Sequence, residues 1–204
     1  MKKSFCISLC LGLAVLLAAP RVADADAQSP GDPAPSAAAP RDEAQDGLFP
    51  ALKKRIVQTW NSNEYDIYLP VHTWHNRLTY DAGKVKKYNE QPWGGGIGRS
   101  MRDEDGDTHS LFIMGFQDSH NRFEPYGGYA YMKNWYAGEK EDLSAGLGFV
   151  LGVTARDQYD YIPLPLPLPI FGVRYKQLAV QSAYIPGGYN DGNVLFTWLR
   201  WHID

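Results

Sequence analysis

Asp118, Ser119 and His120 stand side by side within the stretch GFQDSHNRFEP (115–125). An acid, a hydroxyl and an imidazole are the parts of a triad in which the imidazole takes a proton from the hydroxyl and the acid orients the imidazole. Neighbouring side chains on an extended chain point to opposite faces, so three consecutive residues converge on one reacting atom only where a loop folds them together. Adjacency alone therefore does not define a triad.

A distant imidazole fits this chemistry better. The strand order given below brings His75, Asp118, Ser119 and Arg156 to the same rim of a barrel. Acyl transfer to a hydroxyl requires a base that removes the proton and donors that hold the oxyanion, and this set has both. We therefore expect His75, and not His120, to be the useful imidazole.

Metal chemistry is not expected from this sequence. His72 and His75 are an odd number of positions apart, so on a strand they face opposite sides and make a poor metal pair. The only two cysteines, Cys6 and Cys10, lie in the N-terminal segment 1–25. We expect no disulfide, no metal and no diffusible cofactor.

From residue 64 onward, hydrophobicity alternates with period two, which indicates strands. In LSAGLGFVLGVTAR (143–156), bulky apolar residues alternate with small or polar ones. A soluble lipocalin-type barrel would place its apolar residues inside, whereas a Gly-rich second face is typical of a barrel set in lipid. The sequence predicts an all-β fold, a closed eight-stranded antiparallel transmembrane barrel, with strands near 64–75, 92–103, 108–118, 125–136, 143–156, 169–176, 177–186 and 193–203.

The connections between these strands predict the orientation of the barrel. If the chain enters from the periplasm, the long connections 76–91 and 157–168 lie outside, and the turns 103–107 and 137–142 lie inside. Short periplasmic turns and long external loops are the usual asymmetry of such barrels. The rim that carries His75 is therefore the outer one.

Four segments are expected along the chain. Residues 1–25 have the basic start, apolar run and small residues of a signal peptide, and residues 26–45 read as a disordered Ala/Pro-rich spacer. Residues 46–62 place apolar residues four apart with basic residues on one side, so they predict an amphipathic helix that either packs on a core or lies at a membrane surface. The barrel then occupies 63–204.

The charge of the chain argues against nucleic acid as a partner. The sequence has 20 basic and 23 acidic residues, and the expected signal peptide removes three basic residues and one acidic residue. The remaining chain carries a net charge of about −5, which lacks the basic surface that phosphate binding requires.

Several motifs resemble those of one known family, the PagP-type outer-membrane lipid A palmitoyltransferases, in order and over about 46–203. The resemblance implies an eight-stranded barrel with a leading amphipathic helix, which moves an acyl chain from a glycerophospholipid to a hydroxyl of lipid A. It also implies that His75 is the catalytic histidine and that Asp118, Ser119 and Arg156 occupy the family's other functional positions. The motifs are YDIYLPVHTWHNRLTYD (65–81), YNEQPWGGGIG (88–98), FQDSHNRFEP (116–125), GLGFVLGVTARD (146–157), YIPLPLPLP (161–169) and YIPGGYNDGNVLFTW (184–198).

Further site residues concern the lipid chains. In the resembled family a very small residue at the position of Ala130 forms the floor of the acyl pocket, so Ala130 is expected to point inward between an outward Tyr129 and an outward Tyr131. Proline has no N–H group to donate to a neighbouring strand, so prolines at strand ends predict gaps in the hydrogen bonding of the barrel wall. We expect lipids to enter laterally at two gaps, one flanked by Pro70 and Pro92 and the other by Pro169 and Pro186.

The sequence therefore predicts a monomeric outer-membrane acyltransferase that transfers a palmitoyl or similar chain. His75 would be the general base, supported by Asp118, while Ser119 would hold the ester or its oxyanion, with a covalent acyl-Ser119 as an open alternative. Arg156 would bind the phosphate of donor or acceptor. The rival interpretation is a non-enzymatic structural or adhesive barrel, whose interior would be filled with interlocking polar side chains; the glycines favour an open interior.

Overall fold

The computed structural model describes residues 47–138 and 142–203. The expected signal peptide and spacer lie outside the described residues, as do Asp46 and Asp204. In the described part of the chain, no helix has both the length and the apolar character needed to cross a membrane.

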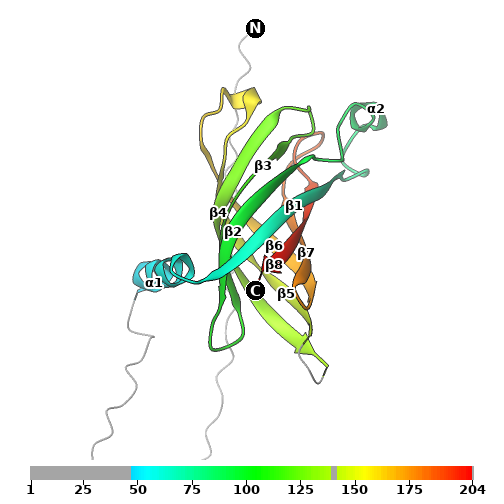
Figure 1. Ribbon diagram of the computed structural model, residues 1–204. Helices are drawn as coiled ribbons and strands as arrows, with labels where there is room; N and C mark the ends of the chain where they lie inside the picture. Colours follow the sequence, from blue (N-terminus) through cyan, green and yellow to red (C-terminus); the bar gives the residue numbers. More distant parts are fainter. Residues whose placement is uncertain (1–46, 139–141, 204) are drawn as a thin grey trace, which may run out of the picture. The chain divides into compact units, whose positions relative to one another are not determined.

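Eight antiparallel strands close into a barrel in sequence order, with β8 pairing back to β1 (Figure 1). This confirms the expected architecture, including the helix that precedes the barrel. The elements are α1 (Leu48–Trp60), β1 (Glu64–His75), α2 (Ala82–Val85), β2 (Gly94–Arg102), β3 (Thr108–Gln117), β4 (Phe123–Ala137), β5 (Leu143–Thr154), the 3-10 turn η2 (Asp157–Tyr159), β6 (Leu164–Tyr175), β7 (Leu178–Ile185) and β8 (Val194–Ile203).

The sixth strand begins earlier than its prolines suggested, at Leu164 instead of residue 169. Pro165, Pro167 and Pro169 all take part in the register with β5. Successive residues of a strand direct their N–H groups to opposite neighbouring strands, so residues at every second position all direct them to the same neighbour. If the nitrogens of these prolines face β7, the hydrogen bonds between β6 and β5 remain intact. Toward that neighbour, β7, pairing begins only at Ile170.

The inner face of the barrel is divided into layers along its axis. Its middle layer is apolar and buried, and includes Tyr68, Met114 and Trp198. Toward the end where β1 begins, buried polar groups follow, and Arg200 donates to Asp66 and Ser110. The rival expectation of a polar interior throughout does not match the apolar middle layer.

Glycines on the inner face make room for aromatic rings. A Cβ added at Gly98 would lie 2.9 Å from the ring of Tyr68, and one added at Gly152 would lie 2.5 Å from the ring of Tyr126. The expectation that these glycines leave open space needs correction at these two positions, because the rings occupy it.

Helix α1 packs against the outside of β2 and β3. Arg99 of β2 joins the helix end to the wall: its guanidinium lies 5.6 Å from the centre of the Trp60 ring and donates to the Ser62 carbonyl. Leu48 is 80% exposed, so the start of the helix is not packed into a core.

Tyr129 was expected to face lipid, but it is buried and hydrogen-bonded to a histidine of β3.

Candidate active site

His75 reaches the inner face because β1 contains a bulge. From Asp66 to Pro70, the even-numbered residues of the strand are buried, but the register with β8 then skips Val71. One extra residue in a strand shifts every later side chain to the opposite face. His75 is consequently buried, with 3% of its surface exposed, while His72 is exposed.

Ser119 lies in the turn that follows β3, on the same rim. Its Oγ is 3.1 Å from Nε2 of His75, and both side chains are buried. The Ser119 carbonyl also accepts a hydrogen bond from the amide of Asn89, which ties this turn to the long loop after β1. The structure therefore brings together the imidazole and the hydroxyl that the sequence placed on one rim.

Two tyrosines hold the imidazole in place. The ring of Tyr80 meets the His75 ring edge-on at 5.2 Å between centroids, and the ring of Tyr88 lies tilted against it at 4.7 Å. Both tyrosines belong to the loop between β1 and β2. Such aromatic contacts restrict the orientation of the ring.

Glu90 is the carboxylate that contacts His75, and sequence reasoning missed it. Its Oε1 is 3.0 Å from Nδ1 of His75 and also accepts a hydrogen bond from the His75 amide. Arg77 donates to both carboxylate oxygens of Glu90. The available signal was the length of the loop between β1 and β2, but that loop also contains Asp81, and spacing alone could not choose between the two acids.

Asp118 was expected to support His75, and in the structure it accepts hydrogen bonds within its own turn. Its Oδ1 accepts hydrogen bonds from the amides of His120 and Arg122, each at 2.8 Å. Asp118 thus caps the turn that carries Ser119. Its physical contribution is to the position of Ser119, because the imidazole already has Glu90 on Nδ1.

His120 does not take part in the contact between Ser119 and His75. Its side chain is 53% exposed, and its Nδ1 lies 3.7 Å from Oδ2 of Asp118. Its ring meets Tyr88 edge-on, at 5.2 Å between centroids. The three consecutive residues therefore do not form a triad among themselves.

Arg156 follows β5 at the same rim, but its partner is a different carboxylate. Its Nε lies 3.1 Å from Oε2 of Glu124, and it is 31% exposed. Thr154 donates to the other oxygen of Glu124. Glu124 is itself buried on β4, so this pair fixes a cation at the barrel mouth beside the turn of Ser119.

Ala130 faces inward, as expected. It pairs with Ser110 on β3 and Val150 on β5, and it packs against the apolar middle layer. Ser110 belongs to the polar layer, where it accepts from Arg200. Ala130 therefore lies at the level where the apolar interior gives way to buried polar groups.

Two pairs of neighbouring strands separate toward the rim that carries His75 and Ser119. Pairing of β1 with β2 ends at Tyr68 and Gly96, so Pro70 lies in the part of β1 that pairs with β8 but not with β2, and Pro92 precedes β2. Pairing of β6 with β7 ends at Ile170 and Ala183, beside Pro169. Pro186 follows directly after β7.

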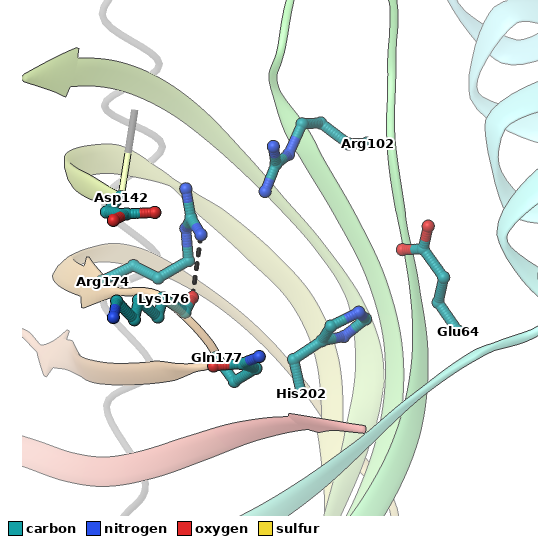
Figure 2. A pocket seen from close by; sticks show the side chains of 7 residues that line it. All are labelled: Glu64, Arg102, Asp142, Arg174, Lys176, Gln177 and His202. Atoms are coloured by element: carbon teal, nitrogen blue, oxygen red, sulfur yellow. Dashed lines mark hydrogen bonds between the residues drawn. The ribbon is translucent and has the colours of Figure 1, made fainter. Parts of the chain in front are cut away.

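A cavity of about 460 Å³ opens at the other end of the barrel. Figure 2 shows Arg102 and Arg174 projecting into it from different strands, with Arg174 donating to the carbonyl of Lys176. None of the site residues expected from the sequence lines it. The lining residues are Glu64, Arg102, Asp142, Arg174, Lys176, Gln177 and His202.

In the described residues, no group of three or more His, Cys, Asp or Glu side chains could hold a metal ion. The fold and the site together define an eight-stranded barrel with a serine, a histidine and a glutamate in hydrogen-bonded series at one rim. That series has the parts required for acyl transfer.

Comparison with known proteins identifies the family. The model of the family described as "Antimicrobial peptide resistance and lipid A acylation protein PagP" matches residues 55–200. The "Lipid A acyltransferase PagP" of Serratia proteamaculans is 50% identical over 158 residues, covering 77% of this chain and 80% of that protein. The "Lipid A acyltransferase PagP" of Photorhabdus asymbiotica is 52% identical over 156 residues, which cover 76% of this chain and 75% of that protein. The chain belongs to the PagP family, and both the family and the barrel fit an outer-membrane protein.

Proposed function

We propose that this protein is an outer-membrane enzyme that transfers a palmitoyl or similar acyl chain from a glycerophospholipid to a hydroxyl of lipid A. Family membership at about 50% identity supports acylation of lipid A. The observation that carries the chemistry is the 3.1 Å contact between Nε2 of His75 and Oγ of Ser119. A buried imidazole whose other nitrogen meets a carboxylate is suited to remove a proton from a hydroxyl.

His75 acts as the general base. It takes the proton from the lipid A hydroxyl while that oxygen attacks the ester carbonyl of the donor. When the tetrahedral intermediate collapses, the ester bond breaks and the proton passes to the lysophospholipid that leaves. Ser119 donates a hydrogen bond to the oxyanion, and Arg156 binds a phosphate group of donor or acceptor.

A covalent route is the second candidate, and the Ser119 to His75 contact favours it. In this route His75 takes the proton of Ser119 while Oγ attacks the donor ester; the ester bond breaks, and the proton passes to the lysophospholipid that leaves acyl-Ser119 behind. The lipid A hydroxyl then gives its proton to His75 and attacks the acyl carbonyl, and the proton returns to Oγ as the bond between the acyl group and Ser119 breaks. Mass spectrometry of the protein after incubation with donor alone separates the routes, because only the covalent one adds an acyl group to Ser119.

The acyl chain occupies the apolar interior. Ala130 forms the floor of its pocket, at the level where buried polar groups begin. A chain that extends further would meet the ion pair of Arg200 and Asp66, which makes a physical stop for an alkyl tail. Donor chain length is thereby limited by the depth of the apolar layer.

Lipids reach the interior from the side, through the wall. Donor and acceptor pass between β1 and β2, beside Pro70 and Pro92, and between β6 and β7, beside Pro169 and Pro186. The supporting observation is that ladder pairing stops at both places. Because each lipid needs only one barrel, the protein works as a monomer.

Incubation of the purified barrel with labelled glycerophospholipid and lipid A tests this function. Labelled lipid A is the expected product, and a matched sample with Glu104→Gln, an exposed carboxylate in the turn between β2 and β3, should form it at the same rate. A barrel that forms no labelled lipid A would support the structural or adhesive alternative.

A further inference from the structure

Glu90 and Ser119 lie on opposite nitrogens of the same imidazole. Oε1 of Glu90 is 3.0 Å from Nδ1 of His75, and Oγ of Ser119 is 3.1 Å from Nε2. A carboxylate on one ring nitrogen keeps the proton there, so that the other nitrogen is left with its lone pair free to accept. The side chain that sets the tautomer of His75 is therefore supplied by the long loop between β1 and β2.

Glu90 is held firmly enough to perform this task. Besides the imidazole, its Oε1 accepts from the amide of His75 at 3.1 Å and from Nη1 of Arg77 at 2.9 Å, and its Oε2 accepts from Nη2 of Arg77. The backbone carbonyl of Glu90 accepts from the amide of Thr73 at 2.9 Å. The loop is thus fastened to β1 on both sides of the carboxylate.

The partners of Glu90 favour its ionised form. Burial alone would raise the pKa of Glu90, but hydrogen bonds from Arg77 and His75, together with the charge of Arg77, outweigh burial and lower the pKa to about 2. A carboxylate that stays ionised can stabilise the imidazolium that forms whenever His75 takes up a proton.

We propose that Glu90 is the positioning residue of the reaction: it fixes His75 with its proton on Nδ1 and stabilises the imidazolium. The inference rests on the proposed role of His75 as the base. Asp118 is the other carboxylate of the rim near Ser119, but its Oδ1 already accepts two amide hydrogen bonds within its own turn. Glu90 thus performs the function that the acid of a serine–histidine–acid triad performs.

The groups around His75 determine how this can be tested by pH. The imidazole is faced by Glu90, Arg77, Tyr80 and Tyr88 from the loop after β1, and by Ser119 and His120 from the turn after β3. Of these, Glu90 alone is an anion in contact with the ring. Its neutralisation should therefore make the imidazole lose its proton at a lower pH, which moves the acidic limb of the pH–rate profile to lower pH.

The experiment compares Glu90→Gln and Glu90→Asp with the unaltered protein, using labelled phospholipid and lipid A across a pH series. Glu90→Gln keeps the size of the side chain and loses its charge, so we expect kcat to fall about a hundredfold with KM little changed. We also expect the acidic limb to move to lower pH. Glu90→Asp restores the charge one methylene further away and should recover part of kcat.

Arg77→Gln separates positioning from loop anchoring. It removes the ion pair of Glu90 with Arg77 but leaves the carboxylate on His75. If Glu90 only anchors the loop, Arg77→Gln will lower activity as much as Glu90→Gln does, and neither variant will move the acidic limb to lower pH. That result, or a Glu90→Gln protein within about twofold of the unaltered rate at every pH, would overturn the proposal.

A parallel His75→Ala sample keeps the two proposals distinguishable. If His75→Ala is inactive while Glu90→Gln is fully active, only the role of Glu90 fails. If His75→Ala is as active as the unaltered protein, the proposed base is wrong, whatever Glu90→Gln does. Glu104→Gln, a change of the same kind at the other end of the barrel, serves as the matched control and should leave both kcat and the pH profile unchanged.

Discussion

Nε2 of His75 lies 3.1 Å from Oγ of Ser119, although the two residues are 44 positions apart in the chain. Each arrives there by a local departure from regular structure. The bulge at Val71 turns His75 to the inner face of β1, and the turn capped by Asp118 lifts Ser119 out of β3. The contact therefore depends on a bulge and a capped turn, and two regular strands would not form it.

The cap by Asp118 predicts different results for two substitutions. Asp118→Ala removes the acceptor of two amide hydrogen bonds and should lower transfer by at least about a hundredfold, since Ser119 loses its position. Asp118→Asn keeps an oxygen that can accept both bonds and should retain much more activity. Initial rates of lipid A labelling distinguish the two variants. An equal loss of rate in both would mean that transfer depends on the charge of Asp118 and not on its hydrogen bonds to the turn.

The gaps between strands predict that cross-links will stop turnover. Both native cysteines lie in the first ten residues, so engineered pairs report on chosen positions. A bifunctional thiol reagent joining Leu69→Cys to Gly95→Cys, or Pro169→Cys to Tyr184→Cys, should block transfer because it closes the path of a lipid. Circular dichroism checks that each barrel remains folded.

The matched control for these cross-links joins Ile67→Cys to Ile97→Cys, which pair within the ladder of β1 and β2. This link bridges strands that are already hydrogen-bonded, so activity should survive. Full activity with both gaps cross-linked would remove lateral entry from the account.

The position of Ala130 predicts the donor preference. Ala130→Gly deepens the pocket by roughly one methylene and should shift the preference to longer chains, whereas Ala130→Met should shift it to markedly shorter ones, because overfilling a packed pocket costs about 1–3 kcal/mol. The native protein should prefer palmitoyl or slightly shorter donors. Rates with a series of donors of graded length test this, and three identical profiles would show that another residue closes the pocket.

A clasp between the loop after β1 and the loop after β7 predicts a dependence on pH. Hydrogen bonds from Tyr189 and Asn190 lower the pKa of Asp81. Because the pKa is lower in the folded protein, the clasp contributes stability above the unfolded value of about 3.9 and loses it as pH falls through the folded value. Exchange of the Asn190 amide, which donates to the Thr79 carbonyl, should be faster in Asp81→Asn than in the unaltered protein at neutral pH. That difference should vanish in acid; equal exchange at neutral pH would exclude the clasp.

The architecture was predictable because period-two alternation and even strand number constrain a closed barrel strongly. The shared rim of His75, Ser119 and Arg156 followed from the parity of strand ends. Alternation could not reveal the bulge at Val71. Pro70, which precedes it, is a residue type found at bulges but equally at strand starts and edges, so it does not fix where the register slips. His75 would otherwise share a face with Ile67, which points outward.

The partners of the site residues were less predictable than their positions. Glu90 and Asp81 both belong to the loop after β1, and only the folded loop shows that Glu90 meets the imidazole while Asp81 binds Asn190. The hydrogen-bond partners of Asp118 were hard to predict for a related reason, since an acid beside a serine can either orient a base or cap a turn.

Transfer of label from phospholipid to lipid A by the His75→Ala protein tests the central claim most directly. The unaltered barrel, His120→Ala, Ser119→Ala and His75→Ala are compared under the same conditions, with circular dichroism to verify folding. We predict that His75→Ala and Ser119→Ala lose at least about a hundredfold in rate, as expected for groups that act on the reacting atoms, and that His120→Ala loses far less. A folded His75→Ala barrel that transfers at the unaltered rate, or an inactive His120→Ala beside an active His75→Ala, would contradict it.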